Sequence, residues 1–393
     1  MGKKNNNLSS YKTFIDSSDK DMISQELMEY DKQFMAEYKA DKRVGIIYFI
    51  TITITILLIS VFIFSFISGR YNISVKDVLS SIFAGIQHGL WWVLSHFDII
   101  LNEPRWMTGP EDTVIWLVRM PRIFAAILVG SSLAVSGATY QGLFRNPMVS
   151  PDILGASAGA SVGACIMMLF NMGPLMVQIA AFVMGIFAVA LSYFLSKSIG
   201  RGTNIVLLLV LCGMTVNTLF QALVSITKYL ADTDEQLPAM TYWLMGSLAK
   251  VSYTDILFFL IPFVLGVIPI MALRWKLNLL SFGEDEAKSM GISVSTVRIV
   301  CIICATLLTA SVVSIAGTIG WVGLMIPHLV RFISGPNNKT LIPFSLLTGA
   351  LFMLVVDNCC RTLLAYEIPL GVLTSLIGAP FFIYILFRTR GNA

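Results

Sequence analysis

The sequence predicts an all-α protein that crosses a membrane about ten times. Of its 393 residues, 56% are hydrophobic and only 13% are charged, whereas soluble domains average about a quarter charged residues. A soluble core of this size could not bury such an apolar excess. The apolar residues also fall into runs of about 20, which is the length that an α-helix needs to cross a bilayer.

We expect ten membrane helices within residues 44–388, preceded by a polar N-terminal tail over 1–43. The first apolar run has no small-residue cleavage site and is too long for the apolar core of a signal peptide, so it should remain as an anchor. The eighth run is short, and Gly317, Gly320 and Gly323 lie at or just before its start, where they favour a break or tilt. The expected spans are 44–68, 123–142, 154–171, 174–197, 204–229, 254–273, 298–317, 319–333, 341–358 and 369–387.

The N-terminal tail contains apolar residues at helical spacing, which predicts one amphipathic helix. These residues are Ile23, Leu27, Tyr30, Phe34 and Tyr38. Such a helix would dock on the inner face of the protein or lie on the membrane. A solvated, partly ordered tail is an equally good interpretation.

The placement of Lys and Arg predicts that both termini are cytoplasmic. With the N-terminus inside, and with only Lys39, Lys42 and Arg43 counted from the tail, the inner segments carry fourteen Lys and Arg residues and the outer segments carry eight. The first outer segment, 69–122, contains Trp91, Trp92 and Trp106, and tryptophan favours the headgroup level of a bilayer. We therefore expect a helix that begins near Ser74 and lies along the outer surface.

Several function classes are disfavoured by what the sequence lacks. The middle of the predicted spans holds almost no ionisable residue, which argues against an ion-gradient-driven secondary transporter, the main alternative from another class. The chain has no G-x-x-x-x-G-K-[ST] phosphate loop, so ATP hydrolysis would need a separate subunit. Three scattered histidines, His88, His96 and His328, favour neither an enzyme nor a metal site. A dispersed formal charge of +4 predicts no nucleic-acid partner, and no bound cofactor is expected.

Two segments near helix ends have the residues of contact sites. Arg119-Met-Pro-Arg122 would present paired positive charge at the outer surface, or would anchor the chain to lipid headgroups. The longest inner loop, within 274–297, contains Gly283 to Gly291, where three acidic residues suit the first turn of a short helix and glycines suit its ends. Such a helix would fit a cytoplasmic partner, with Ala287 and Met290 as apolar contacts.

Six segments in order resemble the FecCD-type permease family, whose members import iron–siderophores, haem and cobalamin. They are R-M-P-R (119–122), G-L-F-R-N-P (142–147), S-P-D-I-L-G-A-S-A-G-A (150–160), F-G-E-D-E-A-K-S-M-G-I (282–292), G-W-V-G-L-M-I-P-H-L-V-R (320–331) and I-P-L-G-V-L-T-S-L-I-G-A-P (368–380). The resemblance covers residues 44 to 388. It implies the type II ABC importer permease architecture, with ten helices in an inverted repeat. A weak internal echo between Leu128–Ala138 and Leu308–Gly317 agrees with such a repeat.

The resemblance also implies partners and a location. Members of the family work in a bacterial or archaeal cytoplasmic membrane as a homodimer or with a paralogous permease. Two cytoplasmic ATPase subunits hydrolyse ATP, and an extracytoplasmic binding protein delivers the substrate. On family frequency an iron–siderophore complex is the expected substrate, with haem or cobalamin as alternatives.

Three sets of residues match family positions with known roles. The docking positions for the binding protein are Arg119, Arg122 and Arg361. The ATPase-coupling positions are Gly283, Glu284, Asp285, Glu286, Ala287, Met290 and Gly291. The cytoplasmic gate matches Thr203 and Asn204, and the pathway is expected to be lined largely by the fifth span. The long tail and the expanded first outer segment depart from the family, and that segment would either modify the docking surface or cover the entrance between subunits.

Overall fold

A computed structural model of the chain describes residues 45, 47–95, 106–107, 109–200 and 205–390. The chain divides into two compact units, Met1–Thr53 and Ile54–Ala393. The amphipathic helix expected in the tail lies outside the described residues. The second unit contains nearly all of the described helices.

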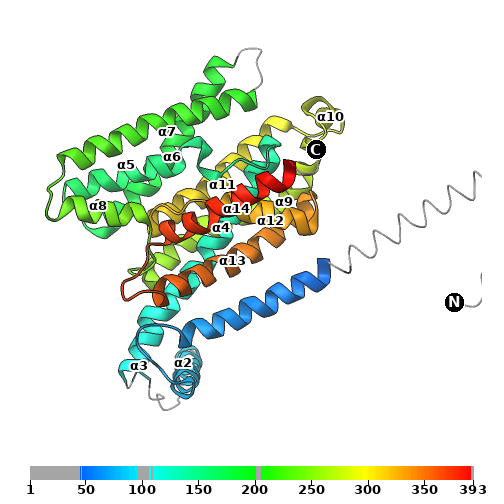
Figure 1. Cartoon of the computed structure of the whole chain (residues 1–393). Coiled ribbons are helices and arrows are strands. Elements are labelled where there is room, and N and C mark those ends of the chain that lie inside the picture. The colour runs from blue at the N-terminus through cyan, green and yellow to red at the C-terminus, as the bar shows by residue number, and fades with distance from the viewer. Residues whose placement is uncertain (1–44, 46, 96–105, 108, 201–204, 391–393) are drawn as a thin grey trace, which may run out of the picture. The chain divides into compact units, whose positions relative to one another are not determined.

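All regular secondary structure in the described residues is helical (Figure 1). The first helix covers Ile47–Ile67 and continues into the second unit. The following elements are α2 (Val75–Ser95), α3 (Pro110–Thr113), the π-helical η1 (Val114–Arg119), α4 (Met120–Phe144), the 3-10 turn η2 (Pro151–Leu154), α5 (Ala156–Leu169), α6 (Pro174–Ile199) and α7 (Ile205–Leu230). The remainder are α8 (Gln236–Met245), α9 (Tyr253–Leu280), α10 (Glu284–Ser289), α11 (Val294–Ala316), α12 (Val322–Ser334), α13 (Asn338–Thr362) and α14 (Leu370–Arg390).

Each of the ten expected spans coincides with one of these helices. By length and composition, eight helices in the described part of the chain could cross a membrane, and three shorter apolar helices accompany them. One of the eight is α2, which matches the helix expected from Ser74 onward. The ten-residue α8 was not predicted, because it is too short to give a span and its sequence has no strong period.

The start of the second span was predicted too late. A continuous helix runs from Pro110 to Phe144, so Arg119 and Arg122 lie within a helix and not in a loop before it. The π-helical turn of η1 ends at Arg119, just before Pro121, which has no N–H to donate. A widened turn of this kind is rare and has no clear sequence signal.

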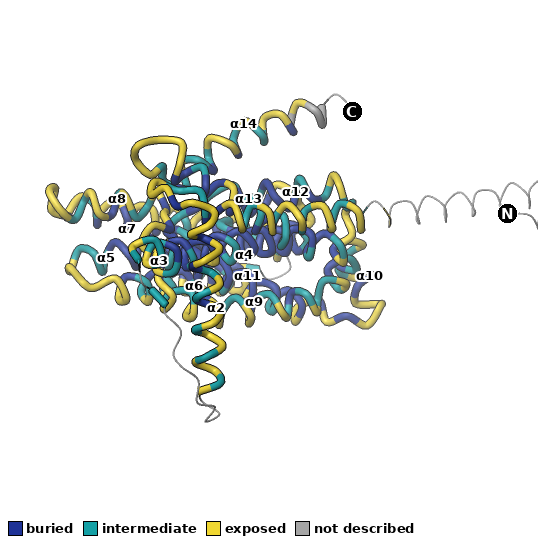
Figure 2. The backbone as a smooth tube through the Cα atoms, turned by 90° about the horizontal axis from the view of Figure 1, so that it is seen from below, coloured by how far each residue is buried: buried dark blue, intermediate teal, exposed yellow. Residues whose placement is uncertain are grey.

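The helices α4 and α11 form the core of the unit, which is the dark blue centre of Figure 2. The helices differ in the buried share of their 18 most apolar consecutive residues. This share is 83% for Pro110–Phe144 and 72% for α11, but only 17% for α9. Glycines bring α4 close to its neighbours. A Cβ on Gly130 would lie 2.1 Å from the carbonyl oxygen of Gly349, and one on Gly137 would lie 1.7 Å from that of Gly323.

The same small-residue packing joins α5 to α6. A Cβ on Gly159 would lie 2.4 Å from the carbonyl oxygen of Met184, and one on Gly163 would lie 2.3 Å from that of Ala180. Small residues allow helix backbones to approach where the bilayer offers no hydrophobic drive for association. These glycines therefore serve packing.

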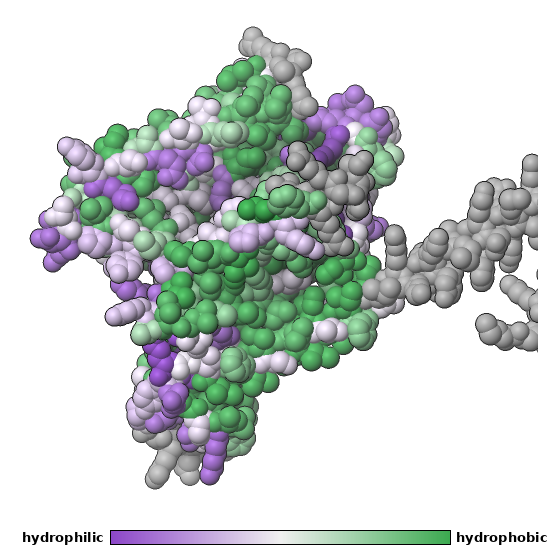
Figure 3. Space-filling view, viewed as in Figure 1, coloured by the Kyte–Doolittle hydropathy of each residue, from purple (hydrophilic) through white to green (hydrophobic). Residues whose placement is uncertain are grey.

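The order of helices repeats between the two halves. The core helix of each half, α4 or α11, is followed by a short helix, α5 or α12, and then by two long ones. Four spanning helices separate α4 from α11, so these two run in opposite directions if each span crosses once. The outward surface of the bundle is apolar over wide areas (Figure 3), as a protein embedded in lipid requires.

Candidate functional site

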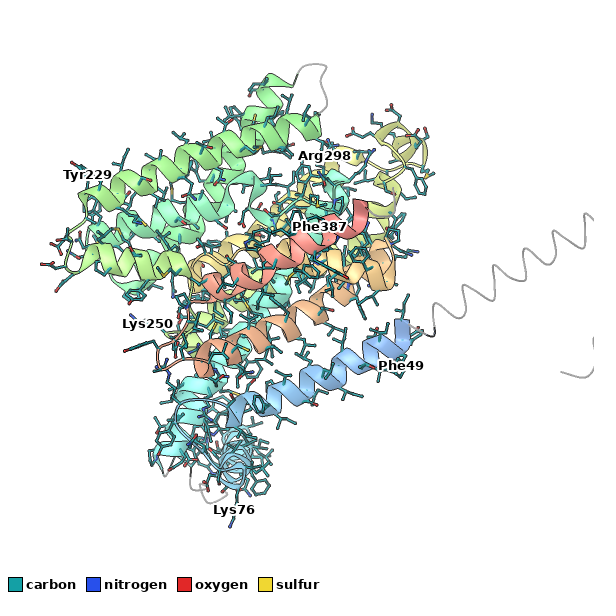
Figure 4. The ribbon with its side chains drawn as sticks, viewed as in Figure 1. Phe49, Lys76, Tyr229, Lys250, Arg298 and Phe387 are labelled. Atoms are coloured by element: carbon teal, nitrogen blue, oxygen red, sulfur yellow. The ribbon has the colours of Figure 1, made fainter. Side chains whose placement is uncertain are left out.

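Polar clusters lie at both ends of α4. Arg122 is near its start, and Phe144 at its end lines a cleft with Glu284 and Asp285. At about 1.5 Å per residue, the two ends are roughly 33 Å apart, the thickness of a hydrocarbon core. Figure 4 shows Arg298 at the α10 end of the bundle and Lys76 of α2 at the other.

The first cluster centres on an ion pair between α4 and α13. The guanidinium Nε of Arg122 donates to Oδ1 of Asp357 at 2.8 Å. Its Nη1 lies 3.0 Å from both carboxylate oxygens of Glu367, in the segment before α14. Asp357 is completely buried, and the side chain of Glu367 is 33% exposed.

Arg361 completes this cluster from the next turn of α13. Its Nε lies 3.2 Å from Oδ2 of Asp357, an ion-pair contact without hydrogen-bond alignment. Its Nη2 donates to the side chain of Asn358, and its Nη1 donates to the carbonyl of Ser68. Asp357 thus lies between two guanidinium groups, which satisfies a charge that would otherwise be costly to bury.

Arg119 is held by backbone carbonyls. Its guanidinium donates to the carbonyl oxygens of Phe66, Ile67 and Tyr71. Three guanidinium groups and two carboxylates leave this cluster with one net positive charge. An acidic surface would therefore be attracted to it.

The three arginines lie close to one another, but they are not displayed on the surface. Only 3% of Arg119 and 5% each of Arg122 and Arg361 is exposed. Their guanidinium groups are used inside the chain, so the expected outward pair of charges is wrong for this conformation. Docking through them stays a prediction that requires the cluster to open.

At the other end, α10 is the short helix that the sequence predicts. Glycines bracket it, with φ of +140° at Gly283 and +79° at Gly291, a backbone region that suits glycine. Arg298 of α11 makes an ion pair with Glu284 and fixes α10 to the bundle. Asp285 accepts a hydrogen bond from Lys288 at 3.0 Å, which raises the pKa of that lysine.

The outward face of α10 differs in part from the expectation. Asp285 and Glu286 are exposed, and Phe282 and Met290 are 67% and 57% exposed. Ala287 is instead fully buried, because the helix turns this position toward its own bundle. Phe282, and not Ala287, therefore joins Met290 as an apolar contact available to a partner.

A cleft of about 440 Å³ lies beside α10. It is lined by Leu143, Phe144, Arg145, Ile205, Val206, Glu284 and Asp285. Ile205 and Val206 begin α7, so the start of α7 reaches this end of the bundle. The gate residues Thr203 and Asn204 themselves lie outside the described residues.

The helix α7 carries an exposed, weakly polar stripe. Thr215, Thr218 and Ser225 are exposed, and each hydroxyl donates to a carbonyl four residues earlier, at 2.9–3.0 Å. Gln221 lies on the same side of the helix and is also exposed. Because the hydroxyl protons are already used, this stripe offers few strong donors to a passing molecule.

Metal-ligating side chains do not gather in the described ranges, where no group of three His, Cys, Asp or Glu residues is placed to hold an ion. Five of the six cysteines are buried and the sixth, Cys359, is half-buried. All six are free thiols, and their burial is consistent with small packing residues.

The FecCD transport family model matches residues 56–388. The chain belongs to the FecCD transport family. It is a multi-pass membrane permease of the ABC importers, and a transporter subunit, not an enzyme.

Relatives in the family are named for different substrates. The molybdate import permease MolB of Haemophilus influenzae is 39% identical, over 82% of this chain and 90% of its own. A Helicobacter pylori permease named provisionally for iron chelatin transport is 40% identical, over 71% of this chain and 83% of its own. Others are named for hemin in Yersinia pestis and vitamin B12 in Vibrio cholerae. A solved inward-facing structure, provisionally of the metal-chelate type, has a TM-score of 0.73 at 37% identity and covers 86% of this chain and 99% of that one.

Sequence reasoning missed four residues at the two ends of α4, which are Glu367, Asp357, Arg298 and Phe282. Glu367 has no local signal, because its contact with Arg122 spans 245 residues. The pairing of Asp357 with Arg361 had a signal, since opposite charges four apart on a helix lie on one face. Phe282 was overlooked as an outward side chain because its orientation depends on the turn at Gly283.

Proposed function

We propose that this permease translocates an iron–siderophore or similar bulky metal chelate, delivered from outside by a binding protein. The observation that carries this substrate class is the agreement of two relatives, one named for iron chelatin and one structure of the metal-chelate type. The family membership supplies the import mechanism. The identity of the substrate is what we add to that mechanism.

The active assembly contains a second permease copy, or a paralogue, and two ATPase subunits. The exposed stripe of α7 supports a pathway between the two permeases. Polar side chains on a membrane helix avoid lipid and face protein or water, and hydroxyls bonded to their own backbone bind a ligand weakly. A large chelate would pass such a wall without being trapped.

ATP-driven coupling is assigned to α10. The acidic pair Asp285 and Glu286, with Phe282 and Met290, forms a compact outward surface fixed to α11 through Glu284 and Arg298. Closure of the ATPases would move this helix and, through the bundle, the two permease halves. In this orientation both termini are cytoplasmic.

Docking of the binding protein is assigned to the opposite end, at the arginine cluster. Its net positive charge suits acidic residues on the partner. Because Arg122 is held by Glu367 and Asp357, an incoming carboxylate would replace Glu367, the more exposed of the two acidic members. Docking would then loosen the link between α4 and the segment before α14.

Molybdate is the second candidate substrate, favoured by MolB, which matches 82% of this chain against 71% for the iron chelatin permease. An oxyanion needs several hydrogen-bond donors, whereas a chelate presents apolar and weakly polar surface. The α7 stripe fits the chelate better. Haem and cobalamin share that bulky, mixed surface and stay within the proposed class.

The test is uptake by proteoliposomes that contain the permease, its ATPase and its binding protein. ATP-dependent accumulation of a ferric siderophore, with no uptake of molybdate, is the expected result. Uptake of molybdate alone would replace the substrate assignment. Uptake that ignores ATP but collapses with a protonophore would contradict the ATP-driven mechanism.

A further inference from the structure

The helix α2 does not run with the membrane helices. In Figure 1 it is seen nearly end-on while α13 and α14 run across the view, and in Figure 2, turned by 90°, α2 extends away from the bundle. Its length and composition would allow it to cross a bilayer. Its direction is nonetheless steeply inclined to that of the spanning helices.

The side chains of α2 divide into three faces, at about 100° per residue. The first face is buried and consists of Val78, Ser81 and Gly85. The second is polar and exposed and includes Lys76, Ser80 and Gln87. The third is apolar and exposed, with side chains 46–62% accessible; it consists of Val75, Leu79, Phe83, Ile86, Leu90 and Val93.

The buried face holds α2 against the start of the second span. A Cβ on Gly85 would lie 1.9 Å from the ring of Trp116, so only glycine fits there. The indole N–H of Trp116 donates to the carbonyl of Ser81 at 3.3 Å. His88 stacks on Trp106, with ring centroids 4.8 Å apart, and Trp106 contacts Trp116. These contacts fix the rotation of α2 about its axis, and hence the direction of the other two faces.

The apolar face continues the lipid-facing surface of the bundle. Ile59, Ile63 and Phe64 of the first helix are about half exposed, as are Leu117 and Val118 of η1. Figure 3 shows this hydrophobic surface near the α2 end of the unit. A water-soluble partner would have to cover a face that is continuous with the membrane-embedded surface.

We propose that α2 is an interfacial helix that lies in the headgroup layer, with its apolar face in the acyl chains of the bilayer. A helix with one apolar and one polar face binds at this depth, and Trp91 and Trp92 near its end suit the headgroup level. Only Lys76 and Asp77 carry formal charge in α2, and they cancel. The partner is therefore the phospholipid surface itself, of either charge.

This placement gives α2 a mechanical role. Trp116, which α2 contacts, precedes Arg119 by three residues in the same helix. Arg119 donates to the carbonyl of Phe66, at the end of the first helix, and to that of Tyr71, in the segment that leads into α2. The bilayer surface thus positions the outer end of the core helix, beside the arginine cluster.

The test uses the full chain in liposomes, with single cysteines labelled by an environment-sensitive fluorophore. The variants are Leu79→Cys and Ile86→Cys on the apolar face, with Ser80→Cys and Gln87→Cys as matched controls on the polar face, 80–120° away around the helix at about 100° per residue. The unmodified chain, whose cysteines are buried or half-buried, is the labelling blank. Nitroxide on the acyl chains should quench the apolar-face labels at least twofold more than the controls, and aqueous iodide should show the reverse. Vesicles with and without anionic phospholipid should give the same result.

Equal quenching by iodide at all four positions would overturn the proposal. So would protection of the apolar face from both quenchers together with disulfide cross-linking of Ile86→Cys between two chains, which would assign this face to a second copy. Loss of nitroxide quenching in zwitterionic vesicles would show that α2 binds lipid through charge and not through its apolar face, and would overturn the proposal. The experiment needs no substrate, ATP or partner protein, so its outcome is independent of the proposed transport function.

Discussion

Arg122 and Asp357, which are 235 residues apart in sequence, form a buried ion pair that joins the start of α4 to the end of α13. The pair lies about two helical turns along both helices from the close contact of Gly130 with Gly349. Charge pairing and close backbone packing thus fix the same two helices. The arginines therefore have a structural role besides any role in docking.

Asp357→Ala should destabilise the permease by about 3–5 kcal/mol. The change removes the carboxylate that compensates the buried positive charges of Arg122 and Arg361. Thermal unfolding in detergent is the measurement. Asp234→Asn, at an exposed position, is the control and should leave the unfolding temperature unchanged. Equal stability of the two variants would mean that water or lipid headgroups reach the cluster.

Under the proposed docking of acidic residues at the arginine cluster, Glu367→Gln should strengthen binding of the binding protein. The change raises the net charge of the cluster from +1 to +2 and frees Nη1 of Arg122. We expect affinity to rise about fivefold, or about 1 kcal/mol, most clearly at low salt. Asp234→Asn makes the same charge change outside the cluster, so a similar gain in both variants would reduce the effect to general electrostatics.

The fold was largely predictable because its signals are local. Runs of apolar residues define the spans, and the spacing of Gly159 and Gly163 predicts a helix contact without naming the partner. The arginine cluster was only half predictable. The sequence predicts which arginines belong to the cluster and at which end of the helices they lie. Whether their side chains are buried depends on Asp357 and Glu367, which only the tertiary structure brings to them.

The outward face of α10 illustrates the same limit. Its existence follows from the acidic first turn and the bracketing glycines, which are local features. Whether Ala287 or Phe282 faces outward depends on the backbone turn at Gly283 and on the ion pair of Glu284 with Arg298. A shift of one residue in a short helix rotates every side chain by about 100°.

Replacing Phe282 and Met290 together by alanine should weaken ATPase binding at least tenfold. Burial of two such side chains contributes about 3–6 kcal/mol in total when complete, and tenfold corresponds to about 1.4 kcal/mol. Binding of the purified ATPase to the reconstituted permease is the measurement. Phe170→Ala, which removes a 65% exposed ring beyond the end of α5, should have no effect. Unchanged ATPase binding by the double variant would remove α10 as the coupling surface.

Gly137→Ala should separate α4 from α12, because its Cβ would lie 1.7 Å from the carbonyl oxygen of Gly323. Neither backbone can yield without moving a core helix, so we expect a loss of about 1–3 kcal/mol or more and a lower yield of folded protein. Gly320→Ala is the matched control, since a Cβ there would meet no atom within 4 Å. Thermal unfolding of both variants in detergent distinguishes the two positions. If Gly137→Ala unfolds at the temperature of the control, the close contact is not a feature of the folded state, and the core of the permease would have to be packed differently.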